Sequence, residues 1–150
     1  MALEFALEIR MALGERMHIN LAEGYTRGAV LVRSGTFSGP GLSGTLVGGS
    51  GGDFPLVRGD GGGRFESQYL LRTDDGATIL KRSAGVRHAE PEVIRRLMGG
   101  EDIDPRAYYM RMTPRFEAPA GPYAWMNRTI FIGVGWRHPE GSLFRFWKWV

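Results

Sequence analysis

The stretch that decides the fold is 65-FESQYLLRTDDGATILKRS-83. Two runs rich in apolar and β-forming residues, Phe65–Thr73 and Ala77–Ser83, flank the turn sequence Asp74-Asp75-Gly76. An Asp-Gly pair between two such runs is a strong signal for a tight turn between antiparallel strands, because glycine accepts the backbone conformation that the turn requires. The stretch therefore predicts a β-hairpin.

Further strand signals extend from this hairpin toward both ends of the chain. Apolar and polar residues alternate from Leu3 to Leu13, and this period of two is typical of a strand with one buried face. Shorter runs bounded by glycine or proline follow at 29–37, 45–47, 54–57, 107–112, 123–136 and 143–150. The sequence therefore predicts many short strands in succession.

One segment predicts a helix. Pro91 suits a first helical position, Ile94 and Leu97 share one face, and Gly99-Gly100 ends the pattern. With about eight to ten strands, one short helix at 91–98 and strand-like segments at both ends, we expect a single all-β domain over 1–150. Pairing the first strand with the last would make it a closed or nearly closed antiparallel β-barrel without open edges.

Composition narrows the classes of function. The chain has 150 residues, 43% of them hydrophobic, and no cysteine, which excludes disulfides and thiolate metal sites. Its three histidines, His18, His88 and His138, show no ligand spacing, so no metal is expected. The net charge of +3 comes from scattered basic residues, which argues against nucleic-acid binding. Without a signal peptide or an apolar run of roughly 20 residues, we expect a cytoplasmic protein with no membrane contact.

The stretch GPGLSG at 39–44 matches the dinucleotide-binding pattern G-x-G-x-x-G. Such a site needs a helix directly after the glycines, because the helix N-terminus faces the phosphates. Here Thr45–Val47 and a glycine-rich continuation favour a strand instead. We therefore expect no nucleotide cofactor, and we interpret GPGLSG as a corner between two antiparallel strands.

Four stretches taken together resemble one protein family. They are GTFSGPGLSGTLVGGSGGDF at 35–54, RGDGGGRFESQYLLRTDDGATI at 58–79, YYMRMTPRFEAPAGPYAWMNRTIFIGVG at 108–135, and the aromatic C-terminal strand. In this order they resemble the bacterial and fungal proteins grouped as domain of unknown function 3237, also called uncharacterised protein family 0311. The resemblance implies a single-domain β-barrel, often an oligomer, and implies no particular chemistry. The family often has aspartate where this chain has Glu66 and arginine where it has Gln68.

The interior of a small barrel is a natural pocket for one small ligand. On the first strand of the hairpin, Glu66, Gln68 and Arg72 share one face, while Tyr69 and Leu71 lie on the other. If the first face lines the pocket, Glu66 is a general base and Gln68 orients the substrate. The alternative is that this face is simply solvated.

A second candidate group lies in the run at 123–136. Trp125 and Asn127 are in phase, so the Asn127 amide would orient a ligand carbonyl beside the Trp125 ring. The alternative is core packing around one satisfied amide. Both this face and the opposite one, which includes Ile132 and Val134, are largely apolar, so one would line the barrel and the other would meet a partner subunit or a covering segment.

Four further residues complete the set of candidates. Tyr109 and Arg111 share a strand face, and the guanidinium of Arg111 suits bidentate binding of a carboxylate. Asp53 and Glu117 are candidate substrate-binding acids. The alternatives are an ion pair for Arg111, a turn role for Asp53 and a solvated rim position for Glu117.

These candidates lead to three hypotheses of function. The first is a cofactor-free enzyme in which Glu66 and Arg111 act by general acid–base chemistry on a partly hydrophobic or aromatic carbonyl compound inside the barrel. Isomerisation, cyclisation and hydrolysis are all open. The second is a barrel that binds a small molecule without catalysis, and the third is a structural oligomer whose barrel is filled by side chains. We expect a small-molecule ligand and a homo-oligomer, dimeric or larger.

Overall fold

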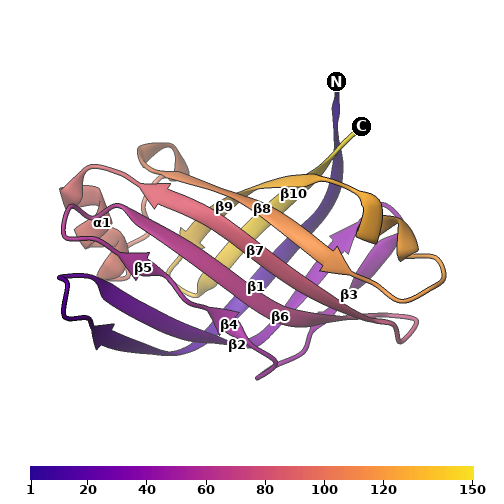
Figure 1. The fold of residues 1–150 in the computed structure, drawn as a ribbon, viewed down its shortest axis with the longest axis horizontal. Helices are drawn as coiled ribbons and strands as arrows, with labels where there is room; N and C mark the ends of the chain where they lie inside the picture. Colours follow the sequence, from indigo (N-terminus) through magenta and orange to yellow (C-terminus); the bar gives the residue numbers. More distant parts are fainter.

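The computed structural model describes residues 1–150, and strands carry most of the chain (Figure 1). The only α-helix is α1 (Pro91–Met98), and two 3-10 turns are η1 (Pro105–Ala107) and η2 (Ala124–Arg128). No helix is long and apolar enough to cross a membrane. The strands are β1 (Leu3–Asn20), β2 (Thr26–Gly39), β3 (Leu42–Leu46), β4 (Gly52–Asp53), β5 (Leu56–Val57), β6 (Gly63–Thr73), β7 (Thr78–His88), β8 (Tyr109–Glu117), β9 (Phe131–His138) and β10 (Gly141–Trp149).

The strands close into an antiparallel barrel. Their order is β1-β10-β9-β8-β7-β6-β3-β2, and pairing of β1 with β2 completes the ring. The first strand also pairs with the last, from Leu3 opposite Trp149 to Ala12 opposite Gly141, as the strand-like termini predicted. The short strands β3, β4 and β5 occupy one position in turn between β2 and β6, so the ring has eight strand positions. The predicted closed all-β barrel is confirmed.

Two predicted turns lie where the sequence placed them. The hairpin β6–β7 closes at Arg72 opposite Thr78, and Gly76 has a φ of 91°, which is strained for residues with a side chain. The GPGLSG stretch forms the corner between β2 and β3, with Gly39 opposite Leu42 and Gly41 at a φ of 68°. A strand, not a helix, follows this corner.

The helix covers one end of the barrel. It lies at the end of the barrel where β7 stops and where β5 is also found (Figure 1). Its apolar side chains Ile94 and Leu97 are buried and join the same core cluster as Phe65 of β6 and Met110 of β8. The predicted helix at 91–98 is therefore confirmed, and it closes the α1 end of the barrel.

The predicted strand at 123–136 is wrong in its first half. Residues 124–128 form the 3-10 turn η2, and the strand begins only at Phe131. The side chain of Asn127 explains the difference, because it binds the backbone of Ala118 twice, donating to its carbonyl oxygen and accepting from its N–H, each at 2.9 Å. These bonds hold a corner that local strand propensity does not anticipate.

The predicted strand at 54–57 is also wrong in its bounds. Strand pairing breaks at Phe54-Pro55 and leaves the two-residue strands β4 and β5 on either side. Pro55 has no N–H to donate to a neighbouring strand, so a continuous ladder is excluded here. This part of the barrel wall is consequently the least regular one.

Interior glycines let aromatic rings fill the barrel. An ideal Cβ on Gly133 would lie 2.4 Å from the Phe146 ring, and one on Gly85 would lie 2.4 Å from the Phe65 ring. Either contact is too short for real atoms, so only glycine permits this packing. The space that Gly133 leaves is therefore occupied by Phe146 and is not open to a ligand.

Candidate functional site

The inward face of β6 carries Phe65, Ser67, Tyr69 and Leu71, all of them buried. Because side chains alternate across a strand, Glu66 and Gln68 point outward and are exposed. They line an open outer groove of about 540 Å³ together with Arg82 and Arg115. The interior placement of Glu66 and Gln68 that the first hypothesis requires is wrong, since burial of the aromatic and aliphatic face decided the orientation of the strand.

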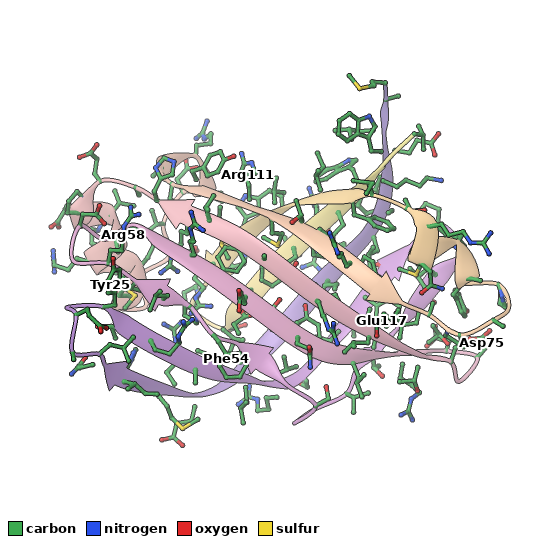
Figure 2. All side chains as sticks on the ribbon, in the orientation of Figure 1. Tyr25, Phe54, Arg58, Asp75, Arg111 and Glu117 are labelled. Atoms are coloured by element: carbon green, nitrogen blue, oxygen red, sulfur yellow. The ribbon has the colours of Figure 1, made fainter.

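The candidates on β8 also point outward. The Arg111 guanidinium lies 4.8 Å from the centre of the Tyr109 ring on the outer surface. Glu117 is exposed, 3.9 Å from the Arg82 guanidinium. Arg111 and Glu117 lie at opposite ends of the strand (Figure 2). The interior placement of these residues is wrong as well, because Met110, Met112 and Phe116 fill the inward positions of β8.

The candidates in η2 do not reach the interior either. Asn127 is exposed and its amide is used by the backbone of Ala118 and Ala124. Trp125 is 37% exposed and lies against the Phe131 ring, with ring centres 5.9 Å apart. Both residues are placed to build the corner that joins β8 to β9.

Asp53 is the one predicted site residue that faces the interior. It lies on β4, opposite Val30 of β2 and Ser67 of β6. Ser67 is in turn opposite Ser83 of β7, so one row of the barrel carries an acid and two hydroxyls. Asp53 is only partly exposed, and the short β4 is what places its carboxyl group in this row.

The same part of the interior holds a lysine. Lys81 is 1% exposed and directly opposite Tyr69 in the hairpin register. Its ammonium group donates a hydrogen bond to the Ser67 Oγ at 3.0 Å. Three rings surround it, with centres 4.6 Å away for Tyr69, 5.5 Å for Phe144 and 5.4 Å for Phe146.

Burial shifts the ionisation of this group of residues. Loss of water around Lys81 lowers its pKa to about 8, and the negative charge of Asp53 opposes that change. Burial raises the pKa of Asp53, while Lys81, Arg137 and Arg87 oppose the rise. Burial also raises the pKa of Tyr69 well above its usual value. The acid and the amine are thus both moved toward neutral pH, which is the pattern that acid–base sites show.

Two hydroxyls of this cluster make no hydrogen bond. The Tyr69 hydroxyl and the Ser83 Oγ are buried without a partner. A buried polar atom without a partner in the protein costs free energy. We refer to Asp53, Ser67, Tyr69, Lys81 and Ser83 as the interior polar cluster.

A family model described as protein of unknown function DUF3237 matches residues 1–149. The chain belongs to the DUF3237 family. A UPF0311 protein of Clostridium acetobutylicum is 38% identical over 122 residues, which cover 81% of this chain and 77% of that protein. A UPF0311 protein of Rhodopseudomonas palustris is 33% identical over 114 residues, covering 76% and 74% of the two chains.

Solved structures show the same fold as this DUF3237 chain. The crystal structure of a conserved protein of unknown function from Rhodopseudomonas palustris matches with a TM-score of 0.92 at 28% identity, covering 98% of this chain and 97% of that one. An enzyme from Penicillium herquei matches with a TM-score of 0.73 at 20% identity, covering 98% and 92%. The second likeness is one of fold.

The charged residue of the interior polar cluster that the sequence interpretation missed in this DUF3237 chain is Lys81. It lies on the inward face of β7, between Ile79 and Ser83. The Asp-Gly turn sets the register that places it opposite Tyr69. Because an isoleucine in a hairpin strand favours the buried face, a lysine two residues later is expected on that same face. This spacing was the signal for a buried charge.

Proposed function

We propose that this protein is a cofactor-free enzyme that uses general acid–base chemistry on a small, partly hydrophobic or aromatic carbonyl compound at the interior polar cluster. The observation that carries the proposal is a fully buried lysine with a pKa of about 8. A general base works best when its pKa lies near the operating pH. Lys81 takes the role that the sequence had suggested for Glu66.

In the proposed mechanism, neutral Lys81 removes a proton from the carbon next to the substrate carbonyl. The electron pair moves onto the carbonyl oxygen, and the unpaired hydroxyl of Tyr69 donates a hydrogen bond to it. Returning the proton from the Lys81 ammonium group to a different carbon completes an isomerisation. Ser67 orients the amine, and the rings of Phe144 and Phe146 form an apolar wall.

Substrate entry needs movement of the barrel wall. The cavity beside Asp53 has a volume of about 30 Å³, about the space of one water molecule. The wall at this point consists of β4 and β5, which are two residues long each and flank Pro55. Outward displacement of this segment would expose Asp53 and the face of Lys81 behind it.

The small cavity favours a second candidate, which is a structural barrel filled by its own side chains. Self-association stays a prediction in both cases. The outer groove of about 460 Å³ over β7–β10 is lined mainly by apolar residues, among them Ile132, Val134 and Trp147. A second copy of the chain would cover this surface.

The enzyme proposal is tested with 5-nitrobenzisoxazole, whose ring opening reports proton removal by a base in an apolar site. We expect turnover that rises with pH around a midpoint near 8 and is lost in Lys81→Met. The chain has one other lysine, Lys148, which lies at the surface beside Glu4, so Lys148→Met is the matched control and should keep full activity.

The pKa of the two lysines is measured on the same protein, produced with isotope-labelled lysine, by NMR titration. A value near 8 for Lys81 supports the proposal. An ordinary lysine pKa at Lys81, or equal activity in wild type and a folded Lys81→Met variant, would contradict it and favour the filled structural barrel.

A further inference from the structure

We propose that Arg87 and Arg137, with Arg16 at the rim, form a binding site for the carboxylate group of a small organic acid at the α1 end of the barrel. This inference rests on the function proposed above and names its substrate class, which is a compound carrying both a carboxylate and a carbonyl group. Neither arginine was a candidate from the sequence.

The barrel brings the three arginines together from distant parts of the chain. Arg16 lies on β1 opposite Val30, Arg87 on β7 opposite Met110, and Arg137 on β9 opposite Ser142. Val30 and Met110 line the small cavity beside Asp53, and so do Arg87 and Arg137. The guanidinium groups of Arg87 and Arg137 therefore flank one interior space, next to the interior polar cluster.

These arginines have no acidic partner within ion-pair distance. None of them is within 4.0 Å of a carboxylate. Arg87 donates to the Met98 sulfur at 3.8 Å, and Arg137 donates to the Ser142 Oγ at 3.2 Å. The Arg137 Nε is buried without any partner. Two partly buried guanidinium groups thus keep donors that no acid of the protein satisfies.

Seven exposed arginines of the same chain do have an acidic partner. Arg95 is paired with Glu92, and Arg106 is bidentate with Asp104, although both arginines are in contact with water. A partly buried charge needs a partner more than an exposed one does, because it has lost part of its hydration. The missing acidic partner of the partly buried Arg87 and Arg137 is explained if an anion from outside the chain is the partner.

The local charge balance favours an anion. Asp53 is the only acid among the residues that line the cavity, and Arg64, Arg87 and Arg137 line it with positive charge. Mutual repulsion adds to burial at this end: burial first, then Arg16 and Arg87, lower the pKa of Arg137 to about 10. A bound anion would remove this repulsion.

The shape of the site favours a carboxylate over a phosphate. The planar guanidinium fork matches a carboxylate in two hydrogen bonds, and a flat carboxylate needs less displacement of the wall around the cavity of about 30 Å³ than a tetrahedral phosphate does. Val30, Phe65 and Met110 give the remaining wall an apolar surface suited to an aromatic ring. Asp53 lines the same cavity, and its partner in the strand register, Ser67, accepts the hydrogen bond of Lys81, so Asp53 connects the anion site to the proposed base.

The test measures binding of sodium benzoate to the full-length protein by calorimetry, with benzamide as the neutral probe of the same shape. We expect benzoate to bind and benzamide not to bind. Arg87→Gln and Arg137→Gln should each weaken benzoate binding at least about tenfold. Arg87→Lys should keep only part of the affinity, because lysine supplies charge without the fork. Arg82→Gln, on the outer face of the same strand, is the matched control and should bind like wild type.

Three outcomes would overturn the carboxylate site. They are equal binding of benzoate and benzamide, an equal loss in Arg82→Gln and Arg137→Gln, and tighter binding of inorganic phosphate than of benzoate. Folding of each variant is checked by thermal unfolding. The Lys81→Met variant separates the two proposals, since it should bind benzoate yet fail to open 5-nitrobenzisoxazole. Benzoate binding by a wild-type protein without turnover would refute the enzyme alone.

Discussion

The two ends of the barrel interior are built from the same strands but from different chemistry. At the turn end of the β6–β7 hairpin, one row places Leu46, Leu71 and Ile79 side by side, all buried. Toward the α1 end, the inward positions that follow carry Lys81 on β7 and, after Tyr69, Ser67 on β6, with Asp53 beside it. The fold does not require polar residues at that end, and burying them costs free energy that an apolar interior would not cost.

The largest effect is expected in the apolar part of the core. Phe131 is 1% exposed and packs edge-on against Phe116, with ring centres 5.0 Å apart. Phe131→Ala should lower the free energy of unfolding by about 3–5 kcal/mol, because it removes buried area and leaves a cavity. Denaturant unfolding measures the change. The neighbouring Ile130 is 65% exposed, so Ile130→Ala should change stability by less than about 0.5 kcal/mol. Comparable losses in the two variants would contradict the assigned packing.

The same contrast explains how far the sequence could lead. The fold rests on local signals that tertiary contacts did not override, namely the alternation in β1, the Asp-Gly turn at Gly76 and the proline at the start of α1. Local signals could not predict the η2 corner, because it depends on hydrogen bonds between the Asn127 side chain and the backbone of Ala118, nine residues away.

The site was harder to predict because it depends on which face of each strand is buried. Both faces of β6 carry polar groups. The face with Tyr69 and Leu71 is the more apolar one only when the apolar area is added up over the whole strand, and that face is the buried one. Asp53 lies on a strand of two residues, too short for any period to show. A lysine is rarely placed inside a barrel from pattern alone, since buried lysines are uncommon.

The polar end should be revealed by the pH dependence of stability. Lys81 has a pKa of about 8 in the folded state and about 10.4 in an unfolded chain. Between these values the unfolded state binds the extra proton, so the free energy of unfolding rises as pH increases from 8 to 10. The full gain is on the order of 3 kcal/mol. Unfolding in denaturant at several pH values measures it.

The control for this pH effect is Lys81→Met, which should be flat over the same range because it cannot titrate at this position. Lys148→Met, in contrast, should keep the wild-type slope, since Lys148 is bound at the surface to Glu4. If the free energy of unfolding of Lys81→Met still rises with pH, another group causes the rise, and the polar end does not owe its pH dependence to Lys81.

The smallest effect separates two hydroxyls that face each other in the polar end. Ser67 accepts the hydrogen bond of Lys81, whereas Ser83, directly opposite Ser67, has a buried Oγ without a partner. Ser83→Ala should therefore raise the free energy of unfolding by about 1 kcal/mol. Ser67→Ala should lower it by about 1–3 kcal/mol, because the buried ammonium group of Lys81 loses its hydrogen-bond acceptor. Paired unfolding curves at pH 7 measure both. If both variants lose stability equally, the Ser83 hydroxyl is hydrogen-bonded and well packed in the core. The cost of the polar end then comes only from burying its charged groups. If Ser83→Ala gains stability, its hydroxyl is kept at a cost, which is what a group retained for a ligand would show.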